Sequence, residues 1–174
     1  VGIRLNLFGK PAPALEQEQW QQFFAQIAPL GWQIELHCPP HYLVQLLPAL
    51  LSYPGNIVLD HFARVDPEKG VQDPDFITIL QHLKLARFWV KVSGFYRLGQ
   101  GEQGKKQAHE AFALLMEHGL SDQLIWGSDW PHTQHESQIS YDTTIRFFHE
   151  MVGDVHLREK ILGTNALTLF DFAP

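Results

Sequence analysis

The sequence has a single cysteine, no run of lysine or arginine, and no long apolar segment. One cysteine excludes an internal disulfide and is typical of a reducing compartment, so we expect a cytoplasmic protein in which Cys38 is a small buried residue. A net charge of −6 without a basic stripe argues against nucleic-acid binding. The apolar runs are too short to cross a membrane, and no signal-peptide pattern opens the chain. We therefore expect no nucleic-acid partner and no membrane partner.

Several compact motifs that indicate a cofactor or a metal are also missing. No predicted strand is followed by GxGxxG or GxxxxGKS/T, so the dinucleotide-binding and P-loop folds lose support. Neither HExxH nor CxxC occurs. What the 174 residues do have is 45% hydrophobic and 12% aromatic content, which is enough for one folded domain with a sizeable core.

Five short segments are predicted to be β-strands, and helical patterns follow them. The strands are expected over residues 2–7, 33–38, 56–62 and 88–94, and from 124 to a stop at Asp129. Apolar spacing and caps predict helices over residues 16–28, after Pro39, from Asp73-Pro74, up to Gly119, across Ile145 and Phe148, and around Leu157 and Ile161. The terminal segment 165–170 should pack across one end of the domain.

This alternation predicts parallel βα units and an α/β fold. Two architectures accept five such units: an open doubly wound sheet, or part of a (β/α)8 TIM barrel. A complete barrel usually needs about 250 residues. The chain therefore has enough residues for five units and not for eight.

Polar side chains mark the end of every predicted strand. Parallel strands covered on both sides should be almost entirely apolar, and buried charges are costly unless they are used. Here the strand ends and the loops after them carry Arg4, Asn6, Glu35, His37, Asp60, His61, Arg64, Lys91, Ser93, Tyr96, Arg97, Asp129, His132 and His135. Any one of them has an ordinary structural explanation, such as helix capping for Asp129. Their recurrence in five successive units favours a shared site.

The residue types indicate hydrolysis of a small anionic ester, lactone or amide. Asp129 could take a proton from water while His61 polarises a carbonyl. Arginine side chains hold carboxylates through paired hydrogen bonds. The same histidine and aspartate residues could instead coordinate zinc and lower the pKa of a bound water. Spacing does not separate these alternatives.

Five segments, GIRLNL, IELHC, IVLDHFAR, WVKVSGFYRL and LIWGSDWPHTQHES, together resemble the second half of an amidohydrolase-superfamily barrel. The closest branch is the TIM-barrel hydrolases that include 2-pyrone-4,6-dicarboxylate lactonase and sugar-acid lactonases. The match runs from Gly2 to about Phe170. The resemblance implies that residues 1–174 form the C-terminal part of such a domain. The five strands would be barrel strands four to eight, with the first three units missing.

The resemblance also implies roles for individual residues. Asp129 would activate water, and His61 would lie near the scissile carbonyl. Positions that bind substrate carboxylates would be occupied by Arg4, Arg64 and Arg97, and the fifth-strand position by His37. Ser93 and Tyr96 are also expected to bind substrate, because they stand at and just after the end of the fourth strand. If a zinc ion is bound, His37, His61 and Asp129 would be its ligands; otherwise no cofactor is expected.

Two departures from the family pattern concern the substrate, and one concerns completeness. His37 stands where the pyrone lactonase has no histidine, and Lys10 stands near a further arginine of that enzyme. The His-x-His pair of the first barrel strand occurs nowhere in the chain. We therefore expect a fragment whose open barrel edges promote homo-oligomer formation. The alternatives to a lactonase are a zinc-dependent amidohydrolase or decarboxylase, and a non-catalytic remnant.

Overall fold

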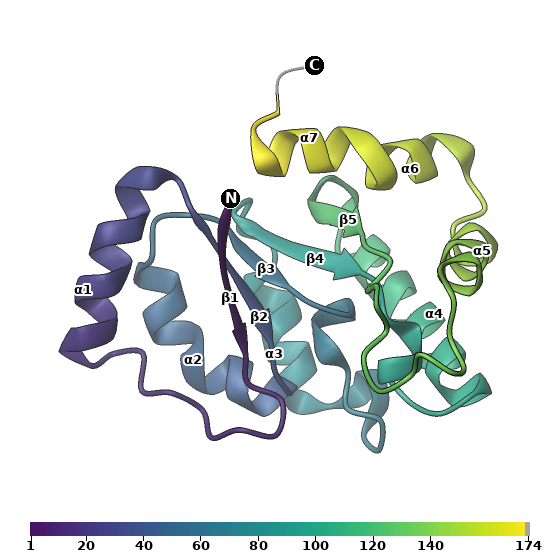
Figure 1. Cartoon of the computed structure of the whole chain (residues 1–174), viewed down its shortest axis with the longest axis horizontal. Coiled ribbons are helices and arrows are strands. Elements are labelled where there is room, and N and C mark those ends of the chain that lie inside the picture. Colours follow the sequence, from purple (N-terminus) through teal and green to yellow (C-terminus); the bar gives the residue numbers. More distant parts are fainter. Residues whose placement is uncertain (173–174) are drawn as a thin grey trace.

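The computed structural model describes residues 1–172 and contains one sheet of five parallel strands in the order β1-β2-β3-β4-β5 (Figure 1). The strands are β1 Gly2–Asn6, β2 Gln33–His37, β3 Ile57–Leu59, β4 Phe88–Val92 and β5 Leu124–Trp126. The sequential order and the parallel register confirm the α/β class and the five successive βα units. The last two residues of the predicted 1–174 domain lie outside the described range.

Helices follow the strands, and α1 to α5 cover one face of the sheet (Figure 1). The helices are α1 Glu18–Ile27, α2 Pro40–Ser52, α3 Pro74–His82, α4 Glu102–Glu117, α5 Tyr141–Met151, α6 Val155–Glu159 and α7 Asn165–Phe170. Asp73 caps α3 as predicted, because its side chain accepts a hydrogen bond from Asp75 N. Ser140 caps α5 in the same way, so Asp129 has no capping role there. Within residues 1–172 no helix has the length and apolarity needed to span a bilayer.

The main core lies between the sheet and helices α1 to α5. Alternate residues of each strand face these helices, and they include Ile34, Leu36, Ile57, Leu59, Phe88 and Val90, all at most 1% exposed. Because each fully buried side chain of this size contributes roughly 1.5–3 kcal/mol, this layer is the main source of stability. The other alternate residues point to the inner face of the sheet, where the polar strand-end groups lie.

Helix α7 closes the end of the sheet at which the strands begin (Figure 1). Leu169 packs against Val58, Trp89 and Ile125, which come from the inner face of three strands. Asn165 fixes the start of this helix by donating from Nδ2 to the Leu124 carbonyl at 2.6 Å. The prediction that residues 165–170 pack across an end of the domain is therefore confirmed. The opposite end is left to the loops that carry the site.

The third strand is shorter than predicted, because it ends at Leu59 and not at Phe62. From His61 to Arg64 four consecutive residues have φ values of 51° to 59°, in the left-handed region that side chains normally avoid. Arg64 N closes this turn on the His61 carbonyl at 2.8 Å. The turn directs the side chains of His61 and Arg64 toward the carboxyl ends of the strands. The fourth strand also stops early, at Val92.

Candidate active site

The loops that follow the strands enclose a hollow of about 730 Å³ at the carboxyl end of the sheet, which we call the mouth. Seven of the eight residues predicted for the site line it: Arg4, His37, His61, Arg64, Tyr96, Arg97 and Asp129. Ser93 does not line the mouth. Ser93 is 5% exposed, and its hydroxyl contacts the His61 ring on the side away from the mouth.

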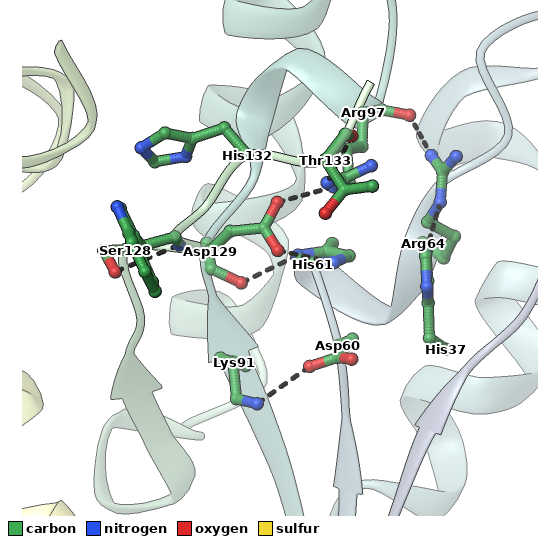
Figure 2. Close-up of polar contacts among 12 residues, drawn as sticks. His37, Asp60, His61, Arg64, Lys91, Arg97, Ser128, Asp129, His132 and Thr133 are labelled. Carbon is green, nitrogen blue, oxygen red and sulfur yellow. Dashed lines mark hydrogen bonds and ion pairs between the residues drawn. The ribbon is translucent and has the colours of Figure 1, made fainter. Parts of the chain in front are cut away.

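The side chains of His61 and Asp129 lie next to each other at the mouth, with His61 Nε2 3.7 Å from Asp129 Oδ1 (Figure 2). The other ring nitrogen, Nδ1, is 2.8 Å from Ser93 Oγ. Gly94 makes room for the ring, because a Cβ at this position would lie 2.6 Å from His61 Nδ1. Two residues 68 positions apart in sequence are thus held within reach of one water molecule.

The pKa shifts of this pair favour a neutral imidazole beside a carboxylate. Burial lowers the pKa of His61 to about 3 and outweighs the attraction of Asp60 and Asp129. Burial opposes ionisation of Asp129, but His61, Tyr96 and Arg97 together lower the pKa of its carboxyl below the ordinary value. The His61 imidazole is neutral near pH 7, so it does not attract the carboxylate as a cation there. The hydrogen bonds from Tyr96 and Arg97 therefore keep the pKa of Asp129 low at that pH. Asp129 is therefore ionised and able to accept a proton.

Within residues 1–172, only one oxygen of Asp129 accepts hydrogen bonds. Oδ2 accepts hydrogen bonds from Tyr96 OH at 2.6 Å and from Arg97 Nε at 2.5 Å. The Tyr96 hydroxyl is also 3.1 Å from His132 Nδ1, and Arg97 Nη2 donates to the Thr133 carbonyl at 3.2 Å. These contacts fix the carboxylate from one side. They leave Oδ1 facing His61 and the mouth.

Arg64 is a buried cation without a carboxylate partner among residues 1–172. Its Nε donates to His37 Nε2 at 3.3 Å, and its Nη1 donates to the Arg97 carbonyl (Figure 2). Burial, followed by the charge of Arg97, lowers the pKa of its guanidinium to about 10. It remains charged at neutral pH. A charge held in this way favours an anion in the mouth.

Deeper on the inner face lies an inner ion cluster composed of Arg4, Glu35, Asp60 and Lys91. Lys91 Nζ is 2.6 Å from Glu35 Oε2 and 2.9 Å from Asp60 Oδ1. Arg4 completes it, with Nε 2.8 Å from Glu35 Oε1 and Nη2 2.5 Å from Asp60 Oδ2. Burial opposes the charge on Asp60, but Lys91, His61 and Arg4 lower the pKa of its carboxyl to about 2.

This cluster corrects one expectation from the sequence. Glu35, Asp60 and Lys91 were grouped with the residues of the mouth, yet none of the three lines it. Arg4 does line the mouth, but its charge is already matched by two carboxylates. The absence of a side chain at Gly127 leaves room for the Lys91 side chain, since a Cβ at Gly127 would be 3.1 Å from Lys91 Cδ.

The residues that could hold a metal ion are not quite those predicted. Ligand atoms of His37, Asp60 and His61 lie within 4.8 Å of one another, whereas Asp129 is outside this group. Within residues 1–172, buried His61 Nε2 has no hydrogen-bond partner, as a ligand nitrogen would require. His37 fits less well, because its Nε2 accepts from Arg64 and the proton of the neutral ring is then on Nδ1. Asp60 also fits less well, because Arg4 and Lys91 already neutralise it. The donor set suits a metal at His61 and only in part at His37 and Asp60.

The sequence model of the amidohydrolase family matches residues 1–172. The chain belongs to the amidohydrolase family. A probable 2-pyrone-4,6-dicarboxylic acid hydrolase from Acinetobacter baumannii, solved with citric acid bound, is 50% identical to this amidohydrolase chain, with a TM-score of 0.96. The alignment covers 99% of the chain and 64% of that structure.

Two curated relatives of this amidohydrolase chain carry lactone-hydrolase names. The 2-pyrone-4,6-dicarboxylate hydrolase of Comamonas testosteroni is 26% identical over 97% of the chain and 58% of its own length. The 4-sulfomuconolactone hydrolase of Hydrogenophaga intermedia is 33% identical over 60% of the chain and 34% of its own length. The amidohydrolase chain thus spans about three fifths of the length of the first relatives it matches.

Two aromatic residues are among the residues of this amidohydrolase site to which the sequence analysis gave no role. Phe8 lines the mouth and lies against Arg64 and His37, but its only sequence signal is an aromatic residue directly after a strand. Trp130 also lines the mouth and is 76% exposed; it stands in the WGSDWPH segment without an assigned role. Exposed aromatic residues in loops that follow the strands were the available signal.

Proposed function

We propose that this chain provides the water-activating part of a hydrolase for a small anionic lactone. The observation that carries the proposal is the placement of three side chains around one hollow. The Asp129–His61 pair, 3.7 Å apart, opens onto the same mouth as the buried, carboxylate-free guanidinium of Arg64. The lactone-hydrolase names of the relatives support the same reaction class.

In the proposed reaction Asp129 accepts a proton from water, and the resulting hydroxide attacks the ester carbonyl of the lactone. His61 polarises the carbonyl oxygen through Nε2, which has no partner of its own. The tetrahedral intermediate collapses as the ring C–O bond breaks. The proton held by Asp129 then passes to the departing oxygen, so that lactone and water give one hydroxy acid.

The remaining site residues would orient these groups or hold the substrate. Tyr96 and Arg97 fix Asp129 Oδ2, and Ser93 fixes the ring of His61. Arg64 would bind a carboxylate of the substrate, with His37 beside it. Arg4 would contribute positive potential from the wall of the mouth. A cytoplasmic setting is part of the proposal, and the single buried thiol of Cys38 supports it.

The test is Asp129→Asn, with turnover of a lactone panel followed by proton release. Loss of the general base should lower kcat roughly a hundredfold to ten-thousandfold. Asp122→Asn is the matched control, because the Asp122 side chain is 79% exposed and forms an ion pair with Lys160 outside the mouth, and turnover should be unchanged. Turnover of Asp129→Asn near the unaltered level would remove Asp129 from the mechanism. An unaltered chain that hydrolyses no lactone would favour a non-catalytic role.

A zinc-dependent hydrolase or decarboxylase is the second candidate, favoured by His61 Nε2, which has no partner in residues 1–172, and by the nearness of the His37 ring. A bound zinc ion would supply Lewis acidity, and these two imidazoles would hold it. Calorimetric titration of the chain with zinc tests this candidate. Stoichiometric binding that His37→Ala abolishes would support it, and no binding would leave the metal-free reaction.

We also propose self-association through the sheet edges, because β1 and β5 each have a strand on one side only in the described range. Light scattering should then give a mass above the 19.9 kDa of one chain. A stable monomer at high concentration would contradict this.

A further inference from the structure

Phe8 is an exposed aromatic residue whose backbone is held in place from both sides. Lys10 N donates to the Leu7 carbonyl at 3.1 Å, which closes a tight turn around Phe8 and Gly9. Gly9 has a φ of 71°, the left-handed conformation that such a turn requires and that glycine adopts without strain. Phe8 N also donates to Asn6 Oδ1 at 3.3 Å. The ring is therefore presented by an ordered turn even though the residue is 51% exposed.

The Phe8 ring covers two groups of the mouth at once. The Arg64 guanidinium carbon lies 4.6 Å from the centre of the ring. The His37 ring is stacked on Phe8, with centroids 5.7 Å apart and an interplanar angle of 8°. A phenyl ring over a guanidinium both attracts the charge and excludes water from its face.

The other contacts of Arg64 determine which part of it stays available. A guanidinium has five N–H bonds. One, on Nε, is used by His37, and one, on Nη1, is used by the Arg97 carbonyl (Figure 2). Three remain on Nη1 and Nη2, and in residues 1–172 none of them has a partner. With its face under Phe8 and its inner edge occupied, Arg64 offers one free edge, the shape that pairs with a carboxylate.

We propose that Phe8 is a positioning residue that holds the Arg64 guanidinium so that its free Nη edge binds a single carboxylate of the ligand. This inference rests on the proposed function, in which Arg64 holds the anionic group of the substrate. It adds that specificity for a carboxylate depends on a residue that need not touch the ligand. It also distinguishes Arg64 from Arg4 and Arg97, whose charges are matched by carboxylates of the chain.

The test measures citrate binding by isothermal titration calorimetry to the unaltered chain, Phe8→Ala, Phe8→Leu, Phe8→Tyr and Arg64→Met. Arg64→Met should abolish the carboxylate site. Phe8→Ala should weaken citrate binding roughly threefold to tenfold, the range expected for a cation–π contact that is partly shielded from water. Phe8→Leu keeps an apolar cover and should rescue only part of the loss, whereas Phe8→Tyr keeps the aromatic face and should restore binding.

Tyr141→Ala is the matched control, because Tyr141 is 52% exposed but does not line the mouth. Its citrate affinity should equal that of the unaltered chain. A spectroscopic measurement keeps the inference testable without a ligand. In NMR spectra the Arg64 side-chain protons should show an upfield ring-current shift that disappears in Phe8→Ala and persists in Phe8→Tyr.

The outcomes distinguish the role of Phe8 from the proposed carboxylate site at Arg64. If Arg64→Met abolishes citrate binding but Phe8→Ala does not change it, the role of Phe8 is overturned and the anion site stands. If citrate binds equally well to Arg64→Met, or does not bind the unaltered chain, the proposed carboxylate site at Arg64 fails, and the role of Phe8 fails with it. Arg64 proton shifts that are equal in the unaltered chain and Phe8→Ala would also overturn the role of Phe8.

Discussion

The inner ion cluster and the mouth lie on the same side of one sheet and differ in how their charges are matched. In the inner ion cluster, Glu35 and Asp60 each contact both Lys91 and Arg4, so two negative and two positive charges cancel. In the mouth, within the described residues, Arg64 has no carboxylate partner and Asp129 Oδ1 accepts no hydrogen bond. Polar burial alone therefore does not mark a functional site. A buried polar or charged group without a partner is a better indication of a functional site.

The largest effect on stability should come from breaking the inner ion cluster. Lys91→Met leaves Glu35 and Asp60 with only Arg4 between them, and Asp60 is 1% exposed. Removing one partner of a buried ion pair costs about 3 kcal/mol of unfolding free energy. Urea denaturation measures the loss. Lys106→Met is the control, because that side chain is 75% exposed, and the change should stay within about 0.5 kcal/mol.

A smaller loss should follow from filling the space that the His61 ring occupies. In Gly94→Ala the new methyl group would meet His61 Nδ1 at 2.6 Å, at a residue with a φ of 55°. Backbone strain and the displaced ring together should cost about 2 kcal/mol. Denaturation and the NMR signals of the His61 ring report the two effects. Gly153→Ala adds its methyl group where no atom lies within 4 Å, so both readouts should be unchanged.

The smallest effect on stability should come from Arg64→Met, although this cation is more buried than Arg4 and Lys91. Loss of the contacts with His37 and the Arg97 carbonyl is offset by removing a buried charge that has no carboxylate. We expect the unfolding free energy to change by less than about 1 kcal/mol. If Arg64→Met lowered the unfolding free energy as much as Lys91→Met, Arg64 would be a structural cation. The mouth and the inner ion cluster would then not differ in how their charges are matched.

Much of the fold was predictable because its signals are local. Apolar runs such as those around Val58 and Val90 define strands, and Asp73-Pro74 defines a helix start. Asp129, His61 and Arg97 were predictable site residues because parallel strands bring their carboxyl ends together. For these three residues the sequence predicted that they would line one site.

The pairing of charges was not predictable in the same way, because it depends on depth within the sheet. Lys91 and Ser93 are two residues apart on one strand, yet Lys91 joins the inner ion cluster and Ser93 supports His61. The left-handed turn from His61 to Arg64 was also missed, since it contains no glycine. Of the four residue types only histidine is enriched at positive φ, and that preference does not predict four such residues in a row, so tertiary contacts impose the turn.

That turn has a consequence for how freely this part of the chain can vary. Each non-glycine residue at positive φ costs on the order of 1 kcal/mol or more, and branching at Cβ makes the conformation worse. Valine, isoleucine and threonine should thus be excluded from all four positions, including Phe62 and Ala63, which do not line the mouth. In a saturation mutagenesis library these positions would form a narrow intolerant window. Backbone geometry, and not contact with a ligand, would be the cause.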